Sequence, residues 1–232
     1  MQRSELQIGN TPALRWGEAA DKIYLFVHGK GGNKEEAARF AAIACAKGWQ
    51  VLSIDLPGHG ESGYAADEFV PWHVTPELHT VMAYLKPQWR RIGLWANSIG
   101  AWFSMLAYAD ITFEKCLFIS PILDMERLVE NMMQWAGVTE ERLQKEQEIK
   151  TGFGETLSWQ YLLYTREHPI IKWNSPTEIL YAGQDNLTER PVAEAFRARF
   201  HAGLTVMEDG EHWFHMPAQL AVLDRWAQNH AE

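Results

Sequence analysis

Apolar residues recur along this chain with two alternating periods. Short, mostly apolar runs, typical of strands, alternate with longer stretches in which apolar residues recur every three or four positions, as in helices packed on one side. The predicted strands are residues 5–8, 13–16, 22–27, 51–54, 92–95, 115–119, 178–181 and 204–207. The predicted helices between them are residues 34–47, 75–89, 99–109, 191–200 and 217–229.

The alternation of strand and helix predicts an α/β fold. Successive strand–helix–strand units favour one mostly parallel central sheet with helices on both faces. The first two predicted strands are joined by Gly9 and Asn10, a turn pair, so we expect only this hairpin to be antiparallel. A chain of 232 residues is long enough for one such domain and its core.

Residues 75–89 carry a recognisable helix start. Thr75 can cap the first turn, and Pro76 suits the first helical position, where its missing N–H costs nothing. The pattern therefore predicts that this helix begins at Thr75.

One segment, residues 122–172, interrupts the alternation. It contains no clear strand, and residues 126–135, 140–150 and 156–165 have helical spacing. A helical insertion after the sixth strand predicts a lid over a functional site of the core. The alternative is that these helices only cover the edge of the sheet. The core would then consist of residues 1–121 and 173–232.

Composition and charge narrow the class of protein. Hydrophobic residues make up 47% and charged residues 22%, as in ordinary globular domains. A formal net charge of -9 argues against nucleic acid as a partner, because phosphate binding needs clustered Lys and Arg. The N-terminus lacks the apolar stretch of a signal peptide, and no apolar run is long enough to span a bilayer, so we expect a cytoplasmic protein.

The clearest chemical motif is residues 94–100, LWANSIG, which runs from a predicted strand into a predicted helix. A nucleophilic serine needs its Oγ atom projected clear of the backbone, and a tight strand–turn–helix does this for Ser98. The neighbours two positions away must be small, and here they are Ala96 and Gly100. The alternative is that Ser98 merely caps the following helix.

Two glycine-containing loops accompany this motif. Residues 27–32, VHGKGG, follow a buried strand, and residues 55–62, DLPGHGES, follow the next one. Glycine lets a loop approach a substrate closely. The first loop matches neither of the usual phosphate-binding spacings, which makes a phosphate cradle a poor interpretation.

Together these three motifs resemble the α/β-hydrolase family, whose nucleophile turn reads G-x-S-x-G; Ala96 in place of the first glycine is a departure. The resemblance implies that Ser98 is the nucleophile. It also implies an oxyanion hole made by the backbone N–H groups of Lys30 and Ile99. In the family the loop matching residues 55–62 is structural, so Asp55 and His59 stay outside the catalytic set.

The family order of nucleophile, acid and base implies where the partners of Ser98 lie. The segment DGEHWFHMP, residues 209–217, follows the last predicted strand and contains His212, which matches the catalytic base, with His215 as the rival. The segment AGQD, residues 182–185, ends in Asp185, which matches the acid. Some family members place the acid one strand earlier, where this chain has Asp124.

The resemblance implies a serine hydrolase that cleaves a small or medium carboxylic ester through an acyl-enzyme, without a metal ion or organic cofactor. A thioesterase, a carbon–carbon bond hydrolase, a lyase with the same triad, and a ligand-binding receptor or scaffold are the alternatives. The expected partner is a small ester-like molecule, and no sequence feature sets the oligomeric state.

Substrate contacts are sought among the 11 tryptophans, an unusually large number. Trp135 and Trp159 lie in the predicted insertion and Trp213 follows His212, so these three are candidates to contact the substrate. Ordinary packing is the alternative for each. The side chain of Lys30, beside an oxyanion donor, suggests a hypothetical contact with an anionic substrate.

Overall fold

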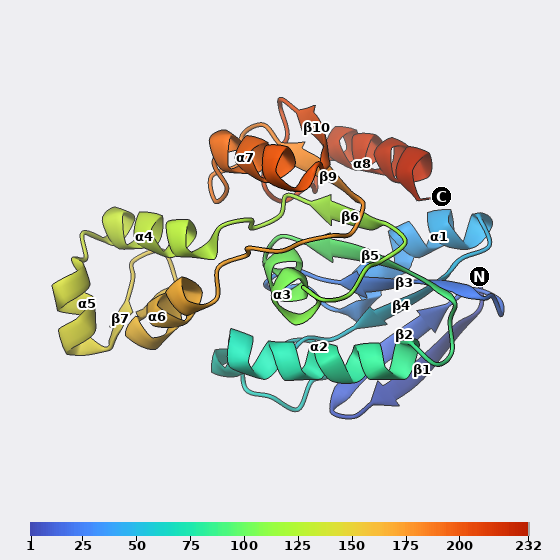
Figure 1. The fold of residues 1–232 in the computed structure, drawn as a ribbon, viewed down its shortest axis with the longest axis horizontal. Helices are drawn as coiled ribbons and strands as arrows, with labels where there is room; N and C mark the ends of the chain where they lie inside the picture. The colour runs from blue at the N-terminus through green and yellow to red at the C-terminus, as the bar shows by residue number, and fades with distance from the viewer. Residues whose placement is uncertain (232) are drawn as a thin grey trace.

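The computed structural model describes residues 1–231. Within them the main sheet has eight strands in the order β1-β2-β4-β3-β5-β6-β9-β10 (Figure 1). The eight predicted strands match these elements to within two residues at each end. The strands are β1 (Arg3–Ile8), β2 (Thr11–Trp16), β3 (Lys22–Val27), β4 (Gln50–Ile54), β5 (Arg91–Asn97), β6 (Cys116–Ile119), β9 (Thr177–Ala182) and β10 (Gly203–Met207).

The sheet is mostly parallel, which confirms the predicted fold class. β3 pairs in parallel with β4 and β5, and the parallel pairing continues through β6 and β9 to β10. β2 runs antiparallel to both β1 and β4. The central strands are buried along nearly their whole length, because helices cover both faces.

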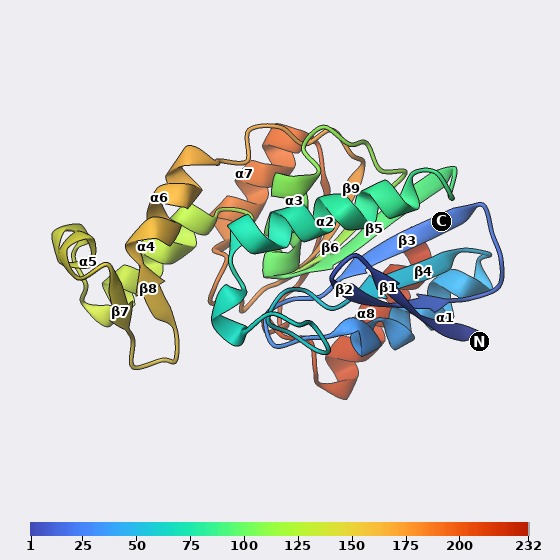
Figure 2. The same ribbon diagram turned by 90° about the horizontal axis from the view of Figure 1, so that it is seen from below.

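Helices cover the two faces of the sheet in separate groups (Figure 2). One face carries a short 3₁₀ turn (Lys34–Ala37), α1 (Ala38–Ala46) and α8 (Pro217–His230). The other carries α2 (Pro71–Leu85), α3 (Ile99–Ala107) and α7 (Arg190–Phe200). Each group encloses its own apolar core, and the core under α2, α3 and α7 is the larger.

The predicted start of α2 at Thr75 is wrong, because the helix begins at Pro71 after the extended residue Val70. Pro71 occupies the first turn, and Pro76 falls inside the helix. Burial outweighs this internal proline, since apolar side chains of the helix recur at helical spacing on the face toward the core. These buried residues are Val74, Leu78, Val81, Met82 and Leu85.

The segment 122–172 contains helices and a small hairpin. The helices are α4 (Met125–Ala136), α5 (Glu140–Glu146) and α6 (Trp159–Glu167), and the hairpin pairs β7 (Glu148–Lys150) with β8 (Thr156–Ser158). The expectation of no strand here is wrong. Gln147 takes a φ of 65°, which ends α5, and Ile149 and Leu157 are buried in the hairpin. Two-residue alternation over three positions is too short to detect in the sequence.

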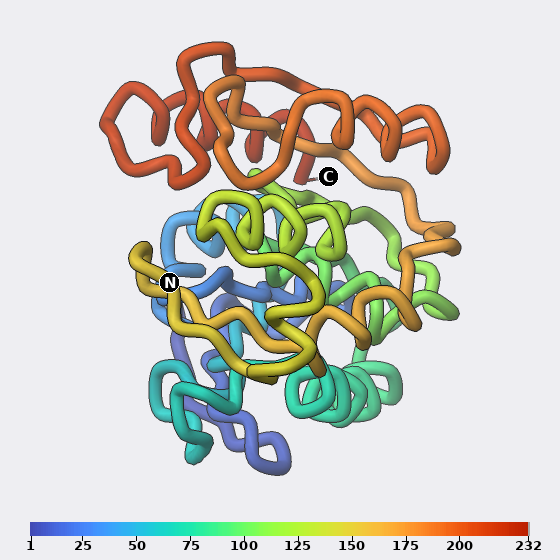
Figure 3. Tube along the Cα trace, turned by 90° about the vertical axis from the view of Figure 1, so that its left-hand side faces the viewer, coloured from blue at the N-terminus to red at the C-terminus, as the bar shows by residue number. Residues whose placement is uncertain are grey.

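This segment, called the insertion below, projects past the carboxyl ends of the parallel strands (Figures 1 and 2), and seen from that end it lies in front of the sheet (Figure 3). α4 packs against α6, and both contact β8. The loops that follow β3, β5, β9 and β10 reach the same end of the sheet, where parallel sheets build their sites. Among the helices in residues 1–231, none has the length and apolar character to cross a membrane.

Candidate active site

Ser98 lies at the turn between β5 and α3, with φ 50° and ψ -124°. A non-glycine residue with positive φ is strained and must be held in place by its surroundings. The Ser98 N–H donates to the carbonyl of Ile119 at 2.9 Å, and its own carbonyl accepts from the N–H of Ile122 at 3.0 Å. The end of β6 and the first residue of the segment 122–172 therefore fix the backbone of Ser98.

Small residues surround this turn. Ala96 is fully buried in β5, opposite Val27 of β3, so the methyl group that departs from the family motif fits inside the sheet. A Cβ atom on Gly29 would lie 3.1 Å from the Cβ of Ser98. The loop after β3 thus runs directly against the serine.

Ser98, His212 and Asp185 form a continuous chain of hydrogen bonds, although they follow three different strands. Ser98 Oγ lies 2.8 Å from His212 Nε2, and His212 Nδ1 lies 2.8 Å from Asp185 Oδ2. The Asp185 carboxylate is fully buried, and its other oxygen accepts from the N–H groups of Leu187 and Thr188. An ionised Asp185 places the proton on Nδ1, which leaves Nε2 free to accept from Ser98.

The rival base and acid lie elsewhere. His215 donates from Nδ1 to the carbonyl of Trp213 at 2.8 Å, and its ring stacks on the Trp213 ring. Asp124 caps the N-terminus of α4, where it accepts from the N–H of Arg127 at 3.0 Å. Within residues 1–231 neither side chain bonds to Ser98 or His212, so the structure brings together the three favoured residues.

The two predicted oxyanion donors lie beside Ser98. Ile99 opens α3, and a first-turn N–H has no acceptor inside its helix. Lys30 follows Gly29 in the loop after β3, and its N–H donates to no acceptor in the described chain. Lys30, Ile99 and Ser98 all line one cavity. The positive end of the α3 dipole also points to this place.

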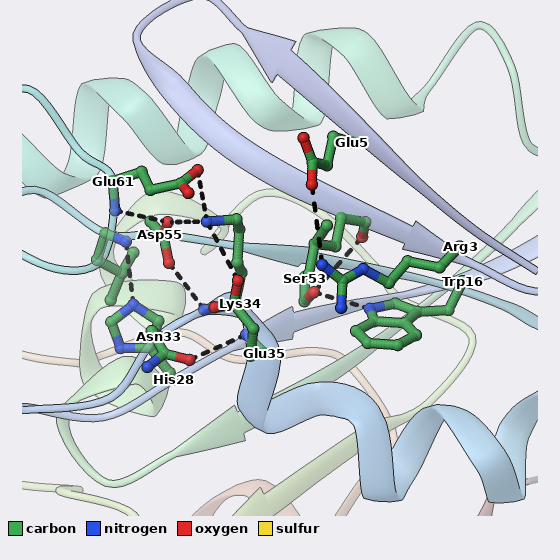
Figure 4. Close-up of polar contacts among 12 residues, drawn as sticks. Arg3, Glu5, Trp16, His28, Asn33, Lys34, Glu35, Ser53, Asp55 and Glu61 are labelled. Atoms are coloured by element: carbon green, nitrogen blue, oxygen red, sulfur yellow. Dashed lines mark hydrogen bonds and ion pairs between the residues drawn. The ribbon is translucent and has the colours of Figure 1, made fainter.

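The loop of residues 55–62 is tied down by a buried ion pair (Figure 4). Asp55 accepts from the Lys34 backbone N–H at 2.8 Å, from Lys34 Nζ at 2.7 Å and from the Glu61 N–H at 2.9 Å. Burial alone would lower the pKa of Lys34, but its bonds to Asp55 and Glu61 raise that pKa above the ordinary value. Asp55 thus forms hydrogen bonds with neighbouring loops and none with Ser98, His212 or Asp185.

Two histidines fix the loop after β3. His28 donates from Nδ1 to the carbonyl of Gly29 at 2.7 Å and accepts at Nε2 from the N–H of Leu56 at 3.0 Å. Burial lowers the pKa of His28 to about 4, so its ring stays neutral at pH 7. His59 Nε2 accepts from the N–H of Gly31 at 2.9 Å. These bonds orient the backbone that carries the Lys30 N–H.

A cavity of about 580 Å³ opens from Ser98 toward the insertion. Trp135 and Phe153 border it with rings 6.1 Å apart in an edge-on arrangement, and half of the Trp135 surface is exposed. Most of the lining residues are apolar, and most belong to the insertion. They include Ile122, Met125, Leu128, Val129, Met132, Leu157 and Tyr161.

A second cavity, of about 550 Å³, lies on the other side of Ser98. His212 and Trp213 line it together with residues of α1 and α8, and Trp213 is 73% exposed. Trp159 lines neither cavity and packs against the larger core. Of the three tryptophan candidates, Trp135 and Trp213 therefore each line a cavity that Ser98 also lines, and Trp159 does not.

Sequence reasoning missed one charged residue at this site. Glu155, in the hairpin of the insertion, forms an ion pair with Lys30, and both line the 580 Å³ cavity. The two residues are 125 positions apart, and Glu155 lies in a turn without a motif. No local signal in the sequence points to this pair.

Comparisons with known proteins show which proteins this chain is similar to. The model of the alpha/beta hydrolase family matches residues 24–225. A stretch of 83 residues, 35% of the chain, is 35% identical to Esterase Rv0045c of Mycobacterium tuberculosis (strain ATCC 25618 / H37Rv), and the chain spans about a quarter (26%) of that curated relative.

Solved structures also resemble the whole chain. A putative hydrolase from Agrobacterium vitis S4 superposes with a TM-score of 0.81 at 17% identity, over 100% of this chain and 99% of that one. Est1E from Butyrivibrio proteoclasticus, in a structure with bound ferulic acid, gives a TM-score of 0.78 at 17% identity, over 97% and 96% of the two chains. At these identities the likeness shows a shared fold.

Proposed function

The chain belongs to the alpha/beta hydrolase family, and from this premise we propose that it is a serine hydrolase that cleaves small or medium-sized carboxylic esters. One observation carries the proposal: Ser98, His212 and Asp185 are joined by two hydrogen bonds of 2.8 Å at a strained strand–helix turn. The name of the curated relative, an esterase, supports the choice of bond.

In the first step, Ser98 Oγ attacks the ester carbonyl while His212 Nε2 takes its proton. The buried Asp185 carboxylate stabilises the imidazolium that forms. The N–H groups of Lys30 and Ile99 receive the developing oxyanion, and each such donor contributes about 3 kcal/mol in the transition state.

To complete the acyl-enzyme, His212 gives its proton to the leaving alcohol oxygen and the carbon–oxygen bond of the ester breaks. His212 then takes a proton from a water molecule, which attacks the acyl-enzyme carbonyl. The attack gives a tetrahedral intermediate. When it collapses, His212 returns the proton to Ser98 Oγ and the carboxylic acid is released.

The position of His212 supports an assignment of the two cavities. Because His212 must protonate the leaving oxygen, the alcohol group belongs on its side, in the 550 Å³ cavity that His212 lines. The acyl group then enters the 580 Å³ cavity, which His212 does not line. The apolar lining of that cavity suits a hydrocarbon or aryl acyl group.

We further propose that residues 122–172 act as a lid on a core made of residues 1–121 and 173–232. The support is that the insertion provides most of the lining of the acyl cavity. In this arrangement Trp135 contacts the acyl group and Trp213 the alcohol group. Trp159 supports the lid through packing instead of contact with the substrate.

The proposal is tested with a fluorophosphonate probe and peptide mapping by mass spectrometry. We expect stoichiometric labelling at Ser98 that is lost in Ser98→Ala and at least a hundred-fold slower in His212→Ala. His215→Ala, in the same loop, is the matched control and should label at the wild-type rate. A folded wild-type protein without labelling at Ser98 would overturn the serine-hydrolase proposal.

Unlabelled enzyme is next assayed on matched oxygen esters and thioesters and on a carbon–carbon bond substrate. Faster hydrolysis of the oxygen esters supports the proposed bond class. If Ser98 is labelled but the enzyme turns over only the thioesters, or only the carbon–carbon bond substrate, that bond class replaces the oxygen ester in the proposal.

A further inference from the structure

The acyl cavity contains one ion pair in otherwise uncharged surroundings. Among the described residues that line it, Lys30 and Glu155 are the charged ones, and Lys30 Nζ is bonded to Glu155 Oε2. The two side chains join the core to the insertion, since Lys30 follows β3 and Glu155 precedes β8. The positive charge of Lys30 is therefore neutralised by Glu155 at the wall of an apolar cavity.

The structure holds Glu155 in this position. The backbone N–H of Glu155 donates to Thr151 Oγ1 at 3.1 Å, and its carbonyl accepts from the Thr151 N–H and hydroxyl, both at 2.8 Å. These three bonds close the turn of the hairpin. They fix the backbone from which the carboxylate of Glu155 reaches Lys30.

The backbone on both sides of Lys30 is also held in place. Gly29 is in contact range of Ser98, and the next N–H, that of Gly31, is bonded to His59. Lys30 thus follows directly after the residue that packs against Ser98. Without Glu155, its ammonium group would be an unpaired cation at the wall of the acyl cavity.

We propose that Glu155 is a specificity-determining residue that masks Lys30 and so restricts the acyl cavity to uncharged acyl groups. A carboxylate at the far end of an acyl chain would meet a neutralised lysine and a like charge on Glu155, and it would lose its hydration among apolar side chains. An uncharged chain of the same shape avoids these costs. The inference rests on the proposed function and revises the expectation that Lys30 binds an anionic substrate.

Two ethyl esters of the same shape test the proposal, because ethoxide is too poor a leaving group for the free carboxylate of the hemisuccinyl ester to expel it without the enzyme. The 4-methylpentanoyl ester carries a branched methyl end where the hemisuccinyl ester carries a carboxylate. The wild-type enzyme should have the higher kcat/KM for the 4-methylpentanoyl ester. In Glu155→Gln, the ratio should shift about ten-fold toward the hemisuccinyl ester, mainly through a lower KM, and the shift should shrink in 0.5 M salt because exposed charges are screened.

Two further variants identify the cause of the shift. Glu148→Gln removes a carboxylate from the other strand of the hairpin, on a side chain that makes no ion pair within residues 1–231, and should keep the wild-type ratio. Adding Lys30→Met to Glu155→Gln should abolish the gain for the hemisuccinyl ester. An unchanged ratio in Glu155→Gln, or the same gain in the double variant, would overturn the proposal.

A measurement without turnover separates this proposal from the proposed function. Succinamate and 4-methylpentanamide have the same two shapes, and each is tested for protection of Ser98 against the fluorophosphonate. Succinamate should protect Glu155→Gln about ten-fold better than it protects the wild type. Labelling at Ser98 with no such difference contradicts the role of Glu155 alone, whereas a wild-type Ser98 that never labels contradicts the hydrolase itself.

Discussion

A Cβ atom on Gly100 would lie 2.4 Å from the carbonyl oxygen of His28, so the first turn of α3 packs directly on the backbone of the loop after β3. Ser98 and the Lys30 N–H lie on the two sides of this contact. The close approach of the proposed nucleophile and its oxyanion donor thus requires glycine at position 100, where any side chain would push the two segments apart.

Gly100→Ala should lower the free energy of unfolding by about 1–3 kcal/mol, because the added methyl would press on backbone that cannot turn away. It should also slow labelling of Ser98. Urea unfolding followed by tryptophan fluorescence measures the first effect. Gly63→Ala is the control, since a Cβ there meets nothing within 4 Å; equal stability of the two variants would contradict the steric argument.

Asp185→Asn should lower kcat by at least about a hundred-fold. The neutral amide does not stabilise the positive charge of the His212 imidazolium, and it can favour the wrong tautomer of His212. Steady-state hydrolysis of a 4-nitrophenyl ester measures it. Asp124→Asn removes the rival carboxylate but keeps a helix-capping side chain, so its kcat should stay within two-fold of the wild type. A larger loss in Asp124→Asn than in Asp185→Asn would reverse the assignment of the acid.

His28 should make the protein less stable as the pH falls. Its pKa is about 4 in the folded protein against 6.5 as the ordinary value, so between these pH values the unfolded chain binds the extra proton. Stability from this group is complete above about pH 6.5 and is lost toward pH 4, by up to about 3 kcal/mol. Urea unfolding at several pH values gives the slope, and an NMR signal of His28 that titrates near pH 6.5 would contradict it.

Lys34→Met should destabilise the protein by about 3–5 kcal/mol, because it leaves the buried carboxylate of Asp55 without its cation. Urea unfolding measures the loss, and adding Asp55→Asn should restore part of it. Lys172→Met breaks the ion pair with Asp110 at the surface and should leave the free energy of unfolding almost unchanged. Comparable losses in the two lysine variants would show that burial of the Lys34 pair is unimportant.

Trp135→Ala should weaken the preference for longer acyl chains, because Trp135 borders the acyl cavity. The ratio of kcat/KM for hexanoyl and acetyl 4-nitrophenyl esters should fall several-fold, mainly through the KM of the hexanoyl ester. Trp159→Ala should instead lower the thermal midpoint and keep this ratio, since Trp159 packs away from both cavities. A change of chain-length preference in Trp159→Ala alone would place the acyl group elsewhere.

Prediction from the sequence succeeded where local patterns have a local cause. The strands of the core are found because continuous apolar runs such as residues 22–27 must be buried on both faces of a sheet. It failed at α2, where Thr75 and Pro76 carry a good start signal that burial of the helix face overrides. It failed again in the hairpin of the insertion, whose strands are too short to show a period.

The sequence by itself determined the order of the elements and the places of the candidate groups at the ends of strands, because apolar periodicity and turn chemistry act over a few residues. Only the tertiary structure decided which side chains meet. Asp185, and not Asp124, lies beside His212, and Glu155 reaches Lys30 across 125 positions. Such contacts depend on how strands and loops pack in three dimensions, and nothing in a local stretch of chain records that packing.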